Sequence, residues 1–165
     1  MAQDFNPPNP SNAYLQDHVQ CLLTSLRHWT GRNLIDPGLP KVEQARQLFY
    51  APFALLSHNT AADPLLNYAN RTGLSLFELS WEELLQTPSR LTAEPAHRDE
   101  RIALLEAVSH RGFIDDYRGV RISKTGRRFL IEKATVWNLR GHDGAHCGQA
   151  ATFSAWIFLE KIAER

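Results

Sequence analysis

Cysteine is scarce in this sequence: only Cys21 and Cys147 occur among 165 residues. They form neither a CxxC pair nor a framework of regularly spaced cysteines. This usage fits a reducing compartment in which both side chains remain thiols, and it argues against a structural disulfide. Stability is therefore expected from a packed core, which a chain of this length can build without covalent cross-links.

Neither sign of charge is in excess, and no long apolar run occurs. Lys and Arg number 18, as do Asp and Glu, so the net charge is zero with neutral histidines. No long-range field draws such a protein onto phosphate, so nucleic acid is not expected as a direct partner. No stretch reaches the roughly 20 apolar residues of a membrane span, and the start lacks the features of a signal peptide. We expect a cytoplasmic protein with no membrane contact.

The sequence also lacks the short motifs of common enzyme classes. No GxSxG, P-loop or dinucleotide-binding fingerprint occurs. Asp115 and Asp116 form a pair of carboxylates, but neighbours in a strand face opposite ways and cannot share acid-base work. Together with Arg118, Arg121 and Lys124 they are predicted to be solvated charges on an edge strand. We expect no catalytic residue and no enzyme activity.

One cluster contains the residue types that bind zinc: His142, Asp143, His146 and Cys147. Strand alternation sends His146 and Cys147 to opposite faces, and the turn before them is expected at the surface. We therefore predict no metal site here, and we interpret Cys147 as a small buried hydrophobe. A redox role for Cys147 would require a stabilised thiolate.

The first 50 residues are predicted to be helical after a polar tail. Residues 1–10 contain three prolines and are expected to be a flexible tail. Apolar residues then recur at helical spacing from Leu15 to Trp29, with Ser11 or Asn12 as N-cap and Gly31 as C-cap. A shorter helix over 42–49 follows and ends before Pro52. Residues 11–50 thus form an N-terminal helical segment, and 51–165 a second unit.

That second unit opens with strands and continues with helices. The apolar runs 53–57 and 65–69 predict two paired strands joined by a polar turn. Ser80 and Glu83 form a capping box that begins a short helix. The longest helix is predicted over 98–110, with Ile102, Leu105 and Val108 on its inner side, charges opposite, and Gly112 as C-cap.

The last third has the two-residue period of strands. The runs 113–123, 129–139 and 146–153 predict a three-stranded antiparallel meander. With the two early strands this gives an α+β protein with a five-stranded antiparallel sheet, helices on one sheet face and an extra N-terminal helix. The apolar run 155–163 is expected to complete the last strand and dock as a helix, or to pair with another subunit.

The order of these elements resembles that of PAS domains, and specific motifs sharpen the likeness. The chain is similar to the MEKHLA domain family, stand-alone bacterial type, through PFALLSH at 52–58, DP at 63–64, NYAN at 67–70, SW at 80–81, PSRL at 88–91 and AEP at 93–95. Its end resembles the C-terminal domain of plant class III homeodomain-leucine zipper proteins, through GF at 112–113, IS at 122–123, GR at 126–127, Glu132, Ala134, Trp137, HC at 146–147 and Trp156. The chain contains no homeodomain and no zipper, so DNA binding is not implied.

The resemblance implies a ligand between sheet and helices and a sensory or regulatory role without a known reaction. Eight polar or aromatic residues are candidates for contacting that ligand: Ser57, His58, Asn67, Asn70, Arg90, Glu94, Glu132 and Trp137. Each also has a structural alternative. Asn70 can cap a helix, Arg90 can pair with Glu94, and Trp137 can fill the core.

The cofactor is left open by the sequence. Residues 80–100 contain no cysteine, which excludes the flavin adduct chemistry of light-sensing PAS domains. Haem would need an axial histidine, for which His97 or His110 are candidates, although surface positions suit both better. Helices that flank PAS cores often form dimers, so the N-terminal helix is either a cover for the sheet or a dimer contact.

Three functions follow, in order of preference. The first is a sensor that binds a small molecule or responds to redox state and signals through a partner protein. The second is a ligand-free interaction or dimerisation module, and the third is an uncharacterised small enzyme. They differ in what they predict: an enclosed pocket with unmatched polar groups, a filled core with an apolar surface patch, or a cleft with a perturbed acid or base.

Overall fold

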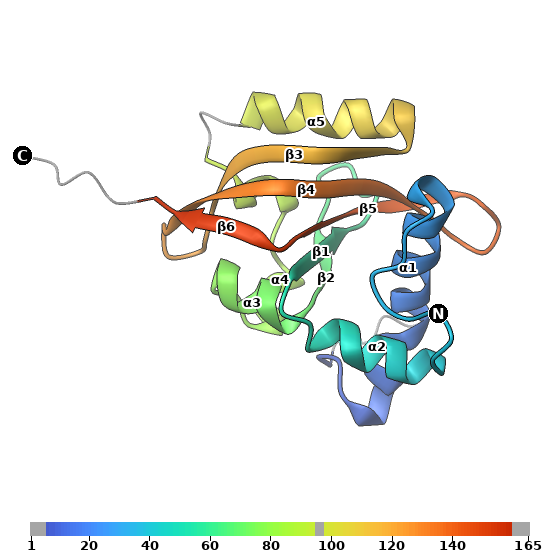
Figure 1. Cartoon of the computed structure of the whole chain (residues 1–165). Helices are drawn as coiled ribbons and strands as arrows, with labels where there is room; N and C mark the ends of the chain where they lie inside the picture. The colour runs from blue at the N-terminus through green and yellow to red at the C-terminus, as the bar shows by residue number, and fades with distance from the viewer. Residues whose placement is uncertain (1–5, 95–97, 160–165) are drawn as a thin grey trace, which may run out of the picture.

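The computed structural model describes residues 6–94 and 98–159, and its centre is an antiparallel sheet (Figure 1). Five strands pair in the order β2-β1-β5-β4-β3, and a sixth, β6, pairs with β4. Their bounds are β1 Ala54–His58, β2 Leu66–Ala69, β3 Phe113–Ile122, β4 Arg128–Arg140, β5 His146–Phe153 and β6 Ala155–Phe158. The two early strands and the meander are thus confirmed, and β5 joins them by pairing with both β1 and β4.

Helices surround this sheet. Their bounds are η1 Pro10–Leu15, α1 Gln16–Thr30, α2 Lys41–Phe49, α3 Arg71–Phe77, α4 Trp81–Leu84, η2 Ser89–Thr92 and α5 Arg98–Arg111. The predicted caps Asn70 of α3, Ser80 of α4 and Gly31 of α1 are all confirmed. None of the described helices is long and apolar enough to cross a membrane.

Two neighbouring residues of β4 show how the helices divide between the faces of the sheet. Trp137 Nε1–H donates to the Leu22 carbonyl of α1 across 3.2 Å, and Asn138 Nδ2–H donates to the Val108 carbonyl of α5 across 3.1 Å. Since neighbours in a strand point to opposite faces, α1 and α5 cover opposite faces of the sheet. Figure 1 shows α5 along β3 and β4, with α1 on the other side.

The start of α1 differs from the prediction. Asn9, not Ser11 or Asn12, is the cap, and it caps η1: its side chain accepts hydrogen bonds from two backbone amides and forms a capping box with Asn12. Residues 13–15 then take left-handed φ angles, so α1 begins only at Gln16. Tyr14 is buried beside Phe49 of α2, and this contact favours the kink over a continuous helix.

The inner face of α5 also differs from the prediction. Ile102 is 52% exposed, whereas Leu104 and Val108 are buried, and so is Arg101, which was expected among the outward charges. Arg101, Leu104 and Val108 follow the i, i+3, i+7 spacing of one helix face. The inner face of α5 therefore includes a charged residue, Arg101, which gives the cavity described below a positive charge.

A sixth strand was not predicted as a separate element. Ser154 interrupts the last strand, and Ala155–Phe158 continues along β4 as β6, with Ile157 opposite Leu130. The apolar run thus completes the last strand, as one of the two alternatives predicted. Its helical continuation over 160–163 lies outside the described residues.

Candidate ligand-binding cavity

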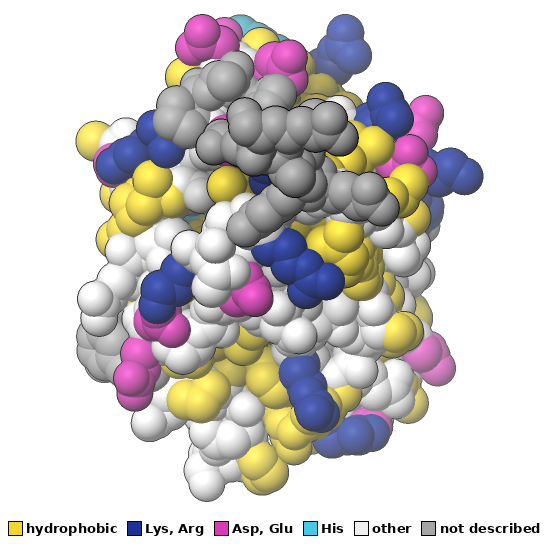
Figure 2. Space-filling model, turned by 90° about the vertical axis from the view of Figure 1, so that its left-hand side faces the viewer, with side chains coloured by type: hydrophobic (Ala, Val, Ile, Leu, Met, Phe, Trp, Pro, Cys, Tyr) yellow, Lys and Arg dark blue, Asp and Glu magenta, His cyan; other side chains and the backbone are white. Residues whose placement is uncertain are grey.

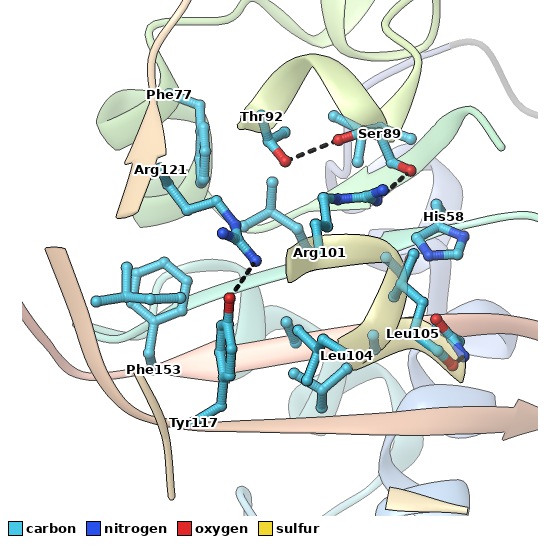
Figure 3. Close-up of a pocket in the computed structure, with 18 residues that line it drawn as sticks. His58, Phe77, Ser89, Thr92, Arg101, Leu104, Leu105, Tyr117, Arg121 and Phe153 are labelled. Atoms are coloured by element: carbon cyan, nitrogen blue, oxygen red, sulfur yellow. Dashed lines mark hydrogen bonds between the residues drawn. The ribbon is translucent and has the colours of Figure 1, made fainter. Parts of the chain in front are cut away.

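A cavity of about 80 Å³ lies between the sheet and α5, and Ser89 and Thr92 of η2 line part of it (Figure 3). This volume has room for several water molecules or one small organic molecule. Most of its wall is apolar and comes from seven elements: β1, β2, α3, α5, β3, β4 and β5. The apolar lining includes Leu56, Phe77, Leu104, Ile131, Val136 and Phe153.

Arg101 brings a positive charge into this apolar wall. The residue is only 8% exposed, and its Nη2–H donates to Ser89 Oγ of η2 across 2.6 Å. Thr92 Oγ1 in turn donates to the Ser89 carbonyl across 2.7 Å, which orders the η2 turn (Figure 3). Burial lowers the pKa of Arg101 to about 10, and the positive charge of Arg121 adds to this effect.

Arg121 brings a second positive charge from β3. It is also 8% exposed and donates through Nη1–H to the Val120 carbonyl and through Nη2–H to Tyr117 Oη, at 2.9 and 3.3 Å. Its guanidinium lies 5.4 Å from the centre of the Tyr117 ring, a cation-π contact. The prediction that Arg121 is a solvated edge charge is wrong, because the irregular pairing of β3 around Tyr117 turns both residues to the inner face.

Neither guanidinium has a carboxylate partner in the described part of the chain. The cavity is lined by no Asp or Glu among those residues, and every acceptor of Arg101 and Arg121 is a neutral oxygen. Asp63 exerts a weak attraction on Arg101, but its own carboxylate is paired with Arg90 at 3.2 Å. Two buried like charges without counter-charge are costly, so the cavity is electrostatically incomplete.

The other end of the cavity presents hydrogen-bond acceptors. His58 Nδ1 lies 2.8 Å from the Asn59 carbonyl, which requires a proton on Nδ1 and leaves Nε2 of a neutral ring as an acceptor. Burial lowers the pKa of His58, which favours this neutral form. Gln149 Nε2–H donates to Asn138 Oδ1 at 2.9 Å, so Gln149 Oε1 is the second acceptor. Both acceptor atoms are buried without a hydrogen-bond partner.

Two of the eight predicted site residues line the cavity. They are His58, through its ring, and Ser57, whose side chain turns to the opposite face and donates to Asn67 Oδ1 across 2.6 Å. Asn67 lies at the bulge between β1 and β2 and lines a different hollow, together with Asn59 and Glu82. The hydrogen-bonded side chains of Ser57 and Asn67 therefore lie outside the cavity interior.

The other five lie elsewhere. Asn70 is fully buried as a cap and tie between segments, and Trp137 is fully buried on the α1 face. The charged three form ion pairs: Arg90 with Asp63, Glu94 with Arg128, and Glu132 with Arg118. Arg90 and Glu94 thus do not pair with each other.

Glu94 instead lines an open surface groove of about 530 Å³ beside α4 and the β3–β4 turn. This groove is larger than the cavity, and two of its charged pairs are matched: Glu94 is paired with Arg128, and Lys124 with Glu83. Arg98 also lines the groove, and its buried Nε has no hydrogen-bond partner. The smaller cavity between the sheet and α5 is the better candidate for a ligand site, because it combines two guanidiniums, with no Asp or Glu among the described lining residues, and two unpaired buried acceptors.

The cavity residues that the sequence did not reveal are Ser89, Thr92, Arg101, Tyr117, Arg121 and Gln149. Arg101 had a usable signal, because it lies three and seven residues before Leu104 and Val108 on the same helical face. For Arg121 the strand irregularity hides the alternation. Nothing local distinguishes Gln149 from a polar residue of an exposed strand.

The remaining cofactor candidates do not reach the cavity. His110 is exposed in the last turn of α5, and His97 lies outside the described residues. Cys147 is exposed near the start of β5, so its interpretation as a buried hydrophobe is wrong. Its sulfur lies 3.7 Å from that of Cys21 on α1.

On the opposite face, His18 ties α1 to β1. Because Ser57 Oγ–H donates to Asn67, His18 Nε2–H donates to Ser57 Oγ, across 3.0 Å. The His18 ring also contacts Tyr68, with ring centres 5.6 Å apart. Burial of the imidazole lowers the pKa of His18 from 6.5 to about 4.

We expect this histidine to make the fold sensitive to acid. In the unfolded chain His18 binds a proton near its ordinary pKa of 6.5, whereas in the folded chain it does so only near pH 4. The free energy of unfolding is therefore at its full value above pH 6.5 and decreases as the pH falls toward 4. Since the residue keeps partial exposure, we expect a loss of about 2 kcal/mol, less than the full shift implies. Urea unfolding at neutral pH and near pH 4, the pKa of His18 in the folded protein, measures this loss of stability. His18→Gln should remove most of this loss and exposed His110→Gln none; an unchanged pH dependence in His18→Gln would contradict the assignment.

Comparison with known proteins agrees with this architecture. The family model for the MEKHLA domain matches residues 16–158, a range that includes α1 and α2 as well as the sheet. Homeobox-leucine zipper protein HOX29 of Oryza sativa subsp. indica is 26% identical over 163 residues, which cover 96% of this chain and 18% of that protein. The chain therefore spans less than a fifth of the length of this relative.

Solved structures show the same fold. A PAS domain from Colwellia psychrerythraea superposes with a TM-score of 0.58 at 16% identity, covering 67% of this chain and 91% of that one. The light-state dimer of the fungal blue-light photoreceptor Vivid gives 0.56 at 16% identity, covering 81% and 91%. Identities this low show the fold alone, and that fold is the PAS fold.

Proposed function

The chain belongs to the MEKHLA domain family, and from this membership and the incomplete cavity we propose that it is a sensory module. In this proposal a small molecule binds between the sheet and α5, and its binding changes how the chain interacts with a protein partner or with a second copy of itself. The observation that carries the proposal is the set of unmatched polar groups around one mostly apolar cavity, namely two guanidiniums without a carboxylate among the described residues and two acceptors without a donor.

The position of these groups supports a ligand better than a purely structural role. A core that only stabilises the fold gains by filling such a space with apolar side chains, because unpaired buried polar groups cost free energy. Here α5 and β3 instead turn charged residues inward beside Phe77 and Leu104 (Figure 3). A bound molecule would meet these groups and also link α5 to the sheet, which gives a route by which occupancy moves a helix.

Signalling needs a surface, and β6 offers one element of it. Ile157 is 55% exposed and Phe158 39% exposed at the end of the sheet. Figure 2 shows this side of the molecule, where Lys, Arg, Asp and Glu side chains are scattered among hydrophobic ones without a field of one sign. Such a mixed surface suits a protein partner or homodimer better than nucleic acid or membrane. The dimer named in the Vivid structure is a property of that protein, and an equivalent here is part of the proposal.

The proposal includes no enzyme activity and leaves the cofactor open. The described cavity contains no cysteine, so a flavin held there could not form a cysteinyl adduct with its wall. The DNA binding implied by the name of the rice relative is not carried over. A cytoplasmic location remains a prediction.

Native mass spectrometry of protein purified from its own host without denaturation tests the proposal. We expect a bound small molecule in the wild type, and its loss in Ala151→Phe, which fills the cavity beside α5. Ala145→Phe in the exposed β4–β5 turn is the matched control and should retain it. A protein without bound mass that is also a stable dimer would favour the alternative, a ligand-free dimerisation module.

A further inference from the structure

The geometry of the cavity points to a class of ligand, and this inference rests on the proposed function. We propose that the cavity binds a small organic anion that carries a hydrogen-bond donor at its other end, such as a hydroxycarboxylate. The anion lies between Arg101 and Arg121, and the donor faces His58 and Gln149.

The anionic end follows from the two guanidiniums. They come from different elements, α5 and β3, yet both reach the same cavity and influence each other electrostatically. Each has satisfied only part of its five donors, and only with neutral oxygens. A carboxylate between them would neutralise the repulsion and accept charge-assisted hydrogen bonds from both sides.

The donor end follows from the fixed orientation of two side chains. The Asn59 carbonyl holds the proton on His58 Nδ1, and three neighbouring oxygens accept from Gln149 Nε2, of which Asn138 Oδ1 is nearest. Nε2 of His58 and Oε1 of Gln149 are therefore both acceptors, and two acceptors cannot satisfy each other. A hydroxyl or amino group of a ligand can donate to either.

The arrangement in space agrees with a ligand that has two different ends. In Figure 3, His58 lies on one side of Arg101 and Arg121 on the other, with Tyr117 beside Arg121. The volume of about 80 Å³ lies well below the roughly 300–1,000 Å³ of drug-sized sites. Both observations favour a compact molecule of a few non-hydrogen atoms over a nucleotide or a flavin.

Thermal unfolding with three matched probes tests the ligand class. Lactate has both the carboxylate and the donor, propanoate lacks the donor, and lactamide lacks the charge. We expect millimolar lactate to raise the unfolding midpoint by a few degrees, propanoate to do so less, and lactamide to have no effect. Equal stabilisation by lactamide and lactate overturns the proposal. So does a lactate effect in the wild type that is no larger than the effect in an Arg101→Gln/Arg121→Gln double variant.

Single variants separate binding from folding. Arg101→Gln and Arg121→Gln should each weaken lactate binding about tenfold to a hundredfold. Arg118→Gln, on the same strand but paired with Glu132 outside the cavity, should not change it. Because the two arginines repel each other, the ligand-free variants should unfold at the same temperature as wild type or higher. A large drop in that temperature would show that the arginines serve the fold, against the proposal.

The outcome also distinguishes this inference from the function on which it rests. If native mass spectrometry finds a bound molecule that both arginine variants retain, the sensory proposal stands and the anion proposal fails. If no molecule is found and no probe binds, both fail.

A second inference rests on a separate observation, the approach of the two cysteines. We infer that Cys21 and Cys147 form a reversible disulfide that ties α1 to the start of β5. Their sulfur atoms are 3.7 Å apart although 126 residues separate them. Cys147 is exposed and accessible to an oxidant, whereas burial raises the pKa of the Cys21 thiol to about 12. The exposed thiol therefore reacts first.

A peroxide supplies the oxidising equivalents. The Cys147 thiolate attacks one peroxide oxygen to give the sulfenic acid, and the Cys21 sulfur then displaces water from it as the disulfide forms. The two thiols lose two hydrogen atoms in all, and hydrogen peroxide is reduced to two molecules of water. The bond would fix α1 to the sheet on the face opposite the cavity.

Intact mass after treatment with stoichiometric hydrogen peroxide tests the disulfide. We expect a monomer that has lost two hydrogen atoms, no free thiol, and an unfolding midpoint raised by several degrees, all reversed by dithiothreitol. Cys21→Ser and Cys147→Ser should show no such rise. A disulfide-linked dimer through Cys147, or sulfinic acid on Cys147 with Cys21 still a thiol, overturns the inference.

Discussion

Replacing Asn70 with alanine is expected to lower the free energy of unfolding by about 4 kcal/mol. The side chain is 0% exposed and makes four hydrogen bonds to the backbone. Its Oδ1 accepts from the amides of Leu55 and Gly73, at 3.0 Å each, and its Nδ2 donates to the carbonyls of Leu48 and Phe53, at 3.1 and 2.8 Å. Alanine leaves these groups buried and unpaired around one small void.

The size of this effect comes from the three segments that the amide joins. Asn70 caps α3, but it also holds the end of α2 and the start of β1, so it is more than a cap. Ser80→Ala is the matched control, because Ser80 caps α4 at an exposed position and should cost about 1 kcal/mol. Urea unfolding of both variants measures the difference. Equal losses would show that the buried network adds nothing to an ordinary cap.

Replacing Gly148 with alanine is expected to cost about 3 kcal/mol or more. Gly148 has a φ of +154°, and a Cβ there would lie 2.3 Å from the carbonyl oxygen of His58. The obstacle is backbone of the neighbouring strand, which cannot rotate away like a side chain. The pairing of His58 with Gln149 between β1 and β5 would have to open. Since both residues line the cavity, the variant should also disturb the acceptor end of the site.

Gly144→Ala, in the turn between β4 and β5, separates the cost of a positive φ angle from the cost of a steric clash. Gly144 also has a positive φ, of +78°, but the nearest obstacle to a Cβ is the flexible end of Arg140, at 3.2 Å. We expect this control to cost about 1 kcal/mol, the usual penalty for a left-handed residue with a side chain. Chemical denaturation gives the stabilities, and the chemical shifts of the His58 ring report on the cavity. A Gly148→Ala protein as stable as Gly144→Ala would contradict the close approach of β1 and β5.

Local signals predicted most of the elements, because their causes are local. Helix starts are marked by side-chain caps, at Asn70 and at Ser80 with Glu83. Helix ends are marked by glycines with positive φ angles, Gly31 and Gly112. Alternating apolar residues placed the strands of the meander within a few residues. The order of the strands within the sheet, β2-β1-β5-β4-β3, has no such local cause, and the residues alone did not predict it.

Most of the cavity's polar lining was not among the predicted site residues, and Arg101 and Arg121 show why. Charged residues in an amphipathic helix or an edge strand usually face solvent, so periodicity assigned both to the outside. In the structure both arginines are buried, against the rule that charged side chains face solvent. Binding sites are where such stability-based rules are expected to fail. The contact of Cys21 with Cys147 was equally hidden, since it depends on how α1 lies on the sheet.

A crystal structure of the protein purified from its own host, without denaturation or refolding, tests the central claim most directly. The account predicts electron density for one compact molecule in the cavity, with an acidic group in contact with Arg101 and Arg121 and a donor near His58 and Gln149. A cavity filled by apolar side chains, with Arg101 turned out to solvent, would contradict it.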